Sequence, residues 1–166
     1  KESAYNMKPG AGTWEILQTS IGQGTTQMTP LHNAMLTAAI ANGGTLMKPY
    51  FLDSVVSAGD ETIKKFMPAA YGNLMSAEEA AGLAELMRAV VTGGTGSAVR
   101  TDAYTVAAKT GSAEFETGKE THAWFTGFAP AEAPRLVVTV LVEEGGSGGK
   151  AAAPIARQLF DIYMGR

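Results

Sequence analysis

Lys109-Thr110-Gly111-Ser112-Ala113-Glu114 is the stretch around which the rest of the chain is arranged, and it closes an extended-looking run. Side chains alternate between the two faces of a strand, so Lys109 and Gly111 share one face while Thr110 and Ser112 share the other. Because glycine has no side chain, a ligand can lie against the backbone at Gly111. The stretch therefore predicts a strand edge that presents an ammonium group and two hydroxyl groups beside bare backbone.

Composition limits the kinds of protein that this chain can be. Its 166 residues are enough for one domain, and 45% hydrophobic with 17% charged residues is typical of a folded globular chain. The formal charge of −3, without a cluster of Lys or Arg, argues against nucleic-acid binding. The absence of cysteine excludes disulfides and thiolate chemistry, and His32 and His122 lie too far apart in sequence to indicate a metal site. No cofactor is expected.

Two stretches carry clear signals for helices. Thr29 is a good N-cap for a helix that has a proline in its first turn, and Gly43-Gly44 would end that helix. Ser76 and Glu79 have the spacing of a capping box, which predicts a second helix to about Val91.

The C-terminal part from Pro154 to Met164 is expected to form a third helix. Its predicted apolar side consists of Ile155, Leu159, Phe160, Ile162 and Tyr163. Two glycine-rich segments, Gly93–Gly96 and Gly145–Gly149, are expected to be a plain turn and a loose turn. Neither has the Gly-Lys-Ser/Thr ending of a phosphate-binding loop.

Three strand-like runs occupy the last third of the chain, namely Tyr104–Glu114, Ala123–Phe128 and Leu136–Glu143. The connections between them are short, which favours antiparallel neighbours. The third run is almost continuously apolar, so both of its faces should be covered. Trp124 and Phe125 would point to opposite faces and both enter the core. Strands combined with helices in this order predict an α+β fold.

The remaining segments carry weaker signals. Thr45–Val56 is extended in character, but a proline confines it to an edge or a loop. Ser57–Asn73 is polar and is expected to consist of turns, and residues 1–28 are mixed. Glu114 is expected to be a solvated or ion-paired side chain and not a general base.

Several segments around the Lys-Thr-Gly box make a resemblance specific. Ser20–Gly24, Met28–Leu31 and Ala39–Gly44 precede the box, and His122–Pro130 follows it. In order and approximate spacing they resemble the transpeptidase domain of the penicillin-binding proteins, and most closely the monofunctional class B proteins. The chain would then be the C-terminal portion of one transpeptidase domain, contributing three strands of an antiparallel sheet packed with helices.

The resemblance implies roles for the residues of the box. Lys109 would supply positive charge to the active-site network. The hydroxyl groups of Thr110 and Ser112 would bind the terminal carboxylate of a D-Ala-D-Ala stem peptide or of a β-lactam. The backbone N–H of Ser112 would form half of an oxyanion hole, and Gly111 would keep the strand edge open. In the family the segment Gly93–Gly96 borders the active-site cleft, so the resemblance leaves a modest binding role open for it beside the plain turn that is favoured.

The nucleophile that such an enzyme needs is not evident in the chain. The family reads the Lys-Thr-Gly box together with upstream Ser-x-x-Lys and Ser-x-Asn boxes. Ser147-Gly148-Gly149-Lys150 lies downstream of the box and contains two glycines, so we expect a coincidental match. Tyr71-Gly72-Asn73 imitates the second box in a turn-rich stretch, and is interpreted in the same way. With neither match accepted, both boxes are expected upstream of Lys1. Lys1-Glu2-Ser3 carries no start signal, so the chain is interpreted as a fragment or a processed piece.

Three other interpretations stay open at this point. A Lys-Thr-Gly sequence on its own is most often an ordinary solvent-facing strand edge. A β-lactamase or a β-lactam-sensing domain would share the box, although Ser20–Gly24 and Thr29–Gly44 favour the transpeptidase. A non-catalytic interaction module of the same fold would also share it.

Partners and location follow from the resemblance alone. It implies peptidoglycan stem peptides and β-lactams as ligands, and an extracytoplasmic parent protein anchored by an N-terminal helix. The run of residues 136–143 would lack one neighbouring strand, which predicts pairing through its open edge with a second copy or with upstream chain.

Overall fold

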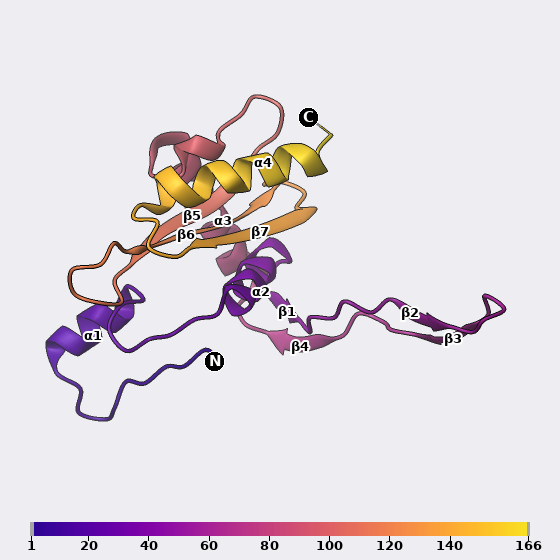
Figure 1. The fold of residues 1–166 in the computed structure, drawn as a ribbon, viewed down its shortest axis with the longest axis horizontal. Coiled ribbons are helices and arrows are strands. Elements are labelled where there is room, and N and C mark those ends of the chain that lie inside the picture. The colour runs from indigo at the N-terminus through magenta and orange to yellow at the C-terminus, as the bar shows by residue number, and fades with distance from the viewer. Residues whose placement is uncertain (1, 166) are drawn as a thin grey trace.

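The computed structural model describes residues 2–165, which form an α+β structure with one main sheet (Figure 1). Its helices are α1 (Thr13–Ser20), α2 (Pro30–Ala41), α3 (Ala77–Gly93) and α4 (Ala153–Tyr163), with short helical turns η1 (Ser97–Val99) and η2 (Gly148–Ala152). Its strands are β1 (Thr45–Met47), β2 (Ser54–Val56), β3 (Thr62–Lys65), β4 (Ala70–Asn73), β5 (Ala107–Ala113), β6 (His122–Ala129) and β7 (Leu136–Val142). None of these helices has both the length and the apolar character needed to span a bilayer.

The main sheet has the strand order β5-β6-β7, and all neighbours are antiparallel, as the short connections predict. In the register, Lys109 lies opposite Thr126 and Gly111 opposite Trp124. The strand prediction is therefore confirmed, with β5 shorter at both ends than the predicted run. Within residues 2–165, β5 and β7 are the two edge strands of this sheet.

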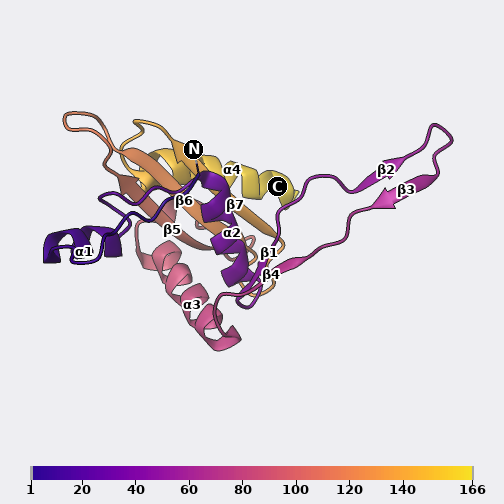
Figure 2. The same ribbon diagram turned by 90° about the horizontal axis from the view of Figure 1, so that it is seen from below.

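Helices cover both faces of the sheet (Figures 1 and 2). One face carries α4, where Phe125, Val138 and Phe160 belong to the larger apolar core. The other face carries α2 and α3, where Phe128 packs with Met87 in a smaller core. This layering confirms that β7 is covered on both faces. It also gives the two faces of β5 different neighbours, which sets the directions of the box side chains.

Capping explains where two of these helices begin. The Thr29 hydroxyl accepts the backbone N–H of His32, and Ser76 and Glu79 make both hydrogen bonds of a capping box. Each group satisfies backbone donors that the first turn leaves without helical partners. The helix starts predicted from the sequence are thus confirmed.

The prediction of turns for Ser57–Asn73 is wrong, because this segment contains β3 and β4. They pair with β2 and β1 to form a long two-stranded arm that projects from the body (Figures 1 and 2). The sequence does not indicate these strands because they are exposed to solvent. All residues of β3 are exposed, so it shows no alternation of buried and exposed positions. Residues 1–28 likewise contain α1, in which no residue is buried.

The predicted apolar side of α4 is only partly covered. Phe160 is fully buried, whereas the residues Ile155, Leu159 and Ile162 are 43%, 44% and 74% exposed. These three residues lie at positions i, i+4 and i+7 of one helix and share one side. An exposed apolar helix face thus accompanies the open edge of β7, against which α4 packs.

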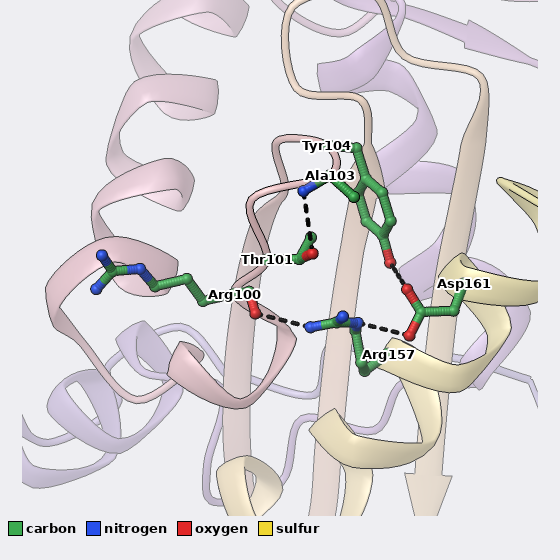
Figure 3. A network of polar contacts seen from close by, with 6 residues as sticks. All are labelled: Arg100, Thr101, Ala103, Tyr104, Arg157 and Asp161. Atoms are coloured by element: carbon green, nitrogen blue, oxygen red, sulfur yellow. Dashed lines mark hydrogen bonds and ion pairs between the residues drawn. The ribbon is translucent and has the colours of Figure 1, made fainter. Parts of the chain in front are cut away.

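A polar network fixes the segment that leads into β5 (Figure 3). Tyr104 donates a hydrogen bond of 2.7 Å to the Asp161 carboxylate, and Arg157 binds the other oxygen of that carboxylate at 2.7 Å. Arg157 also donates to the carbonyl of Arg100. Burial and the hydrogen bond to Asp161 raise the pKa of Tyr104 to about 12, while the Tyr104 hydrogen bond lowers the pKa of Asp161. The network therefore favours the neutral phenol beside the ionised carboxylate.

This network predicts a stability change at alkaline pH. An exposed tyrosine has a pKa of about 10, so Tyr104 in the folded chain retains its proton as the pH rises from there toward 12. The unfolded state loses that proton first, so the stabilisation by Tyr104 is present below pH ~10 and falls above it. The difference in unfolding free energy between the wild type and Tyr104→Phe should therefore shrink over this range. Urea titrations at several pH values measure it, and a constant difference would contradict the assignment.

The open edge of β7 and the exposed side of α4 predict self-association of the isolated 166-residue chain. Ile162→Lys places a charge on this surface and should weaken the association seen by sedimentation velocity. Phe51→Lys is the matched control, because Phe51 is 95% exposed on the distant arm and its replacement should leave association unchanged. A wild-type chain that stays monomeric at high concentration would contradict the prediction.

Candidate active site

The Lys-Thr-Gly box lies in the middle of β5, on the free edge of the sheet. Thr110 points to the face of α4 and η2, since its partner Phe125 belongs to the core on that side. Lys109 points to the opposite face, opposite Thr126, whose hydroxyl bonds to Thr37 of α2. The alternation predicted from the sequence therefore holds.

The Lys109 side chain bends back to the edge of its own strand. Its ammonium group donates to the carbonyl oxygen of Thr110 at 2.5 Å, and the side chain is exposed. The positive charge thus lies beside the free edge and not deep in the core. An anionic ligand that pairs with this edge would meet it directly.

The two hydroxyl groups of the box have different surroundings. Ser112 is exposed, whereas Thr110 is only 8% exposed. The Thr110 hydroxyl forms a hydrogen bond of 2.5 Å with the hydroxyl of Thr95, which lies between α3 and η1. The sequence favours a plain turn for Gly93–Gly96, so it does not predict the contact of Thr95 with the box. The signal that points toward the site is the resemblance, in which this segment borders the active-site cleft.

The free edge of β5 holds a carboxamide group. The side chain of Gln23 donates to the carbonyl of Ser112 at 3.1 Å and accepts from the backbone N–H of Glu114 at 3.3 Å. These are the contacts that a peptide group of an added strand would make. The N–H and C=O of one residue in a strand point to the same side, so the N–H of Ser112 also faces this edge.

A small cavity of about 230 Å³ lies beside the box. Its lining includes Gln23, Gly111, Ser112 and Trp124. Trp124 is therefore a half-buried wall of this cavity and not a core residue as predicted, whereas Phe125 is fully buried as predicted. A cavity of about 280 Å³ between α2 and α3 contains no residue of the box, so we assign the site to the former.

The segment Gly145–Gly149 is not the loose turn that the sequence predicts. Gly148 is buried at the start of η2, where an added Cβ would lie 2.5 Å from the carbonyl oxygen of Gly111 and would also strike that of Trp124. An added Cβ on Gly149 would lie 2.5 Å from the carbonyl oxygen of Thr95. Two successive glycines thus allow η2 to support both the box and the Thr95 loop.

Other residues considered in the sequence do not join the site. Ser147 and Lys150 flank Gly148 and Gly149, the two glycines that form the glycine support behind the box. Asn73 accepts a hydrogen bond from the Thr45 hydroxyl where β1 pairs with β4. His122 stacks on Phe115 and its ring accepts the N–H of Glu144. Among residues 2–165 no group of three potential metal ligands occurs. The side chain of Glu114 is exposed.

Comparisons with known proteins show which family the chain resembles. Residues 3–161 match the model of the penicillin binding protein transpeptidase domain. The chain is 40% identical to the peptidoglycan D,D-transpeptidase PbpA of Mycolicibacterium smegmatis over 84% of its length, and 32% identical to MrdA of Acinetobacter baumannii over 96%. It covers 30% and 26% of those relatives, so it spans less than a third of their length.

A solved structure shares the fold. The penicillin G acyl-enzyme complex of penicillin-binding protein A from Mycobacterium tuberculosis superposes with a TM-score of 0.85 at 36% identity. The match covers 95% of this chain and 37% of that structure. The predicted fold class is therefore confirmed.

The glycine support predicts a large effect of one methyl group. Gly148→Ala places a Cβ against two backbone carbonyls, which side-chain motion cannot relieve, so unfolding free energy should fall by about 3 kcal/mol. Gly82→Ala in α3 is the control, because its Cβ meets nothing within 4 Å and should stabilise the helix by about 0.5–1 kcal/mol. Chemical denaturation measures both, and an unchanged stability of Gly148→Ala would contradict the packing.

Proposed function

Since the chain belongs to the penicillin-binding protein transpeptidase family, we propose that it supplies the ligand-binding strand of a peptidoglycan D,D-transpeptidase. The substrates are stem peptides that end in D-Ala-D-Ala, and β-lactams are inhibitors that acylate the same enzyme. The names of the relatives as D,D-transpeptidases favour this reaction over β-lactam hydrolysis or sensing.

One observation carries the proposal: the free edge of β5 already holds a carboxamide in the manner of a bound peptide. The Gln23 side chain donates a hydrogen bond to the carbonyl of Ser112 and accepts one from the N–H of Glu114. A stem peptide that takes the place of this side chain pairs with the same backbone groups. Its carboxylate then lies near the Lys109 ammonium and the hydroxyl groups of Thr110 and Ser112.

The chemistry of the strand follows from charge. When a serine oxygen attacks the carbonyl carbon between the two D-Ala residues, negative charge develops on the carbonyl oxygen. The backbone N–H of Ser112 stabilises this charge, and such a donor typically contributes a factor of about 10²–10³ in rate. The C–N bond then breaks, the terminal D-Ala leaves with a proton on its nitrogen, and the acyl group passes to an amine of a second stem peptide.

The nucleophilic serine comes from a part of the protein outside these 166 residues. Ser147 does not fill that role, because it lies at the N-cap of η2 and downstream of the Lys-Thr-Gly box, whereas the family has its Ser-x-x-Lys box upstream. The complete enzyme works on the outer side of the cytoplasmic membrane, where peptidoglycan lies, and is held there by an N-terminal anchor.

A labelled penicillin tests the proposal. The isolated chain should show no covalent adduct by intact-mass analysis, whereas the full-length protein should show one adduct per molecule. In the full-length protein, Lys109→Ala should slow acylation by about 10²-fold, since it removes a charge at the site.

Ser147→Ala is the matched control and should acylate at the wild-type rate. An adduct on the isolated chain, above all at Ser147, would overturn the assignment of the nucleophile. A full-length protein that is never acylated would overturn the proposed function itself.

A further inference from the structure

Thr95 contacts the Lys-Thr-Gly box from outside β5, through the hydrogen bond between its hydroxyl group and that of Thr110. It lies in the three-residue link between α3 and η1, flanked by Gly94 and Gly96. The backbone N–H groups of both glycines donate to the carbonyl of Val90, at 3.1 and 3.0 Å. The link is thus folded tightly onto the end of α3, with Thr95 at its tip.

The geometry of this link holds Thr95 from two sides. An added Cβ on Gly94 would lie 2.9 Å from the carbonyl oxygen of Val90, so a side chain there would push the tip outward. On the other side, Gly149 of η2 lies directly against the carbonyl of Thr95. The position of the Thr95 backbone is therefore fixed before any ligand arrives.

The hydroxyl pair of Thr95 and Thr110 has one proton to spare. Each hydroxyl group carries one donor proton, and the 2.5 Å hydrogen bond between the two groups uses one of these protons. Thr110 is only 8% exposed, whereas Thr95 is exposed. Thr95 is the more exposed of the two residues, and when Thr110 donates to Thr95 the free proton is the one on the Thr95 hydroxyl.

We propose that Thr95 is a specificity-determining residue whose hydroxyl donates to the ligand's terminal carboxylate, with Thr110 orienting it. An ionised carboxylate accepts hydrogen bonds and donates none, so it matches this arrangement. The Lys109 ammonium at the carbonyl of Thr110 supplies the opposite charge nearby. This inference rests on the proposed function, since it concerns the substrate of that same site.

The test separates carboxylate recognition from a structural role. In the full-length protein, rates of acylation are measured with benzylpenicillin and with its methyl ester, which lacks the charge. Thr95→Val should slow acylation by the acid about 10- to 100-fold, the effect expected for a lost hydrogen bond to a charged group. The rate with the ester should change less than about twofold, and Thr95→Ser should restore the rate with the acid.

Thr92→Val is the matched control, since Thr92 is an exposed threonine on the same helix end and its hydroxyl bonds only the carbonyl of Ala89 among residues 2–165. Thr95→Ala repeats the test with a smaller side chain, and melting temperatures report the folding of each variant. Equal losses with acid and ester, or no loss with either, would overturn the role of Thr95. A wild type that neither compound acylates would instead overturn the proposed function.

Discussion

The free edge of β5 depends on backbone contact between Gly111 and Gly148. No side chain separates β5 from η2 there, so the strand has a rigid support directly behind the box. The same helical turn supports the Thr95 link through Gly149. Two glycines of one turn therefore fix the relative position of three segments that are distant in sequence. The segments approach this closely because the two glycines have no Cβ, and any Cβ would force the segments apart.

A second constraint lies on the opposite face, beneath Lys109. Thr37 of α2, Thr126 of β6 and Thr139 of β7 form a chain of hydroxyl groups with distances of 2.7 Å. Thr37 also donates to the carbonyl of Asn33. Buried hydroxyl groups are costly without partners, so this chain fixes how α2 lies across the sheet. Because Thr126 is the direct partner of Lys109 in the register, the network also fixes the base of the lysine side chain.

The parts of the fold that the sequence predicts well have local causes. Capping by Thr29 and Ser76, apolar runs and short connections are visible in neighbouring residues. They predict α2, α3 and α4, the strands of the main sheet and the directions of Lys109 and Thr110. The missed features arise from contacts between distant segments. Gln23 meets Ser112, and Thr95 meets Thr110, only after the chain has folded. The exposed strands β3 and β4 were not predicted either, because pairing in a solvent-facing ribbon needs no apolar alternation.

The two edge strands of the main sheet differ in chemical character. β5 is suited to bind a polar ligand, and β7 is suited to pack against another protein segment. On β5, the outward backbone groups of Ser112 and Glu114 bond to an exposed side chain, and an ammonium lies beside them, so a polar ligand can exchange with that side chain at little cost. β7 carries a nearly continuous apolar sequence and lies under a helix whose Ile155 and Ile162 are exposed. Because water solvates such a surface poorly, a partner that covers it has to bury the apolar side chains and also form hydrogen bonds with the open backbone edge of β7. A strand with an attached helix meets both demands, whereas a small polar ligand meets neither.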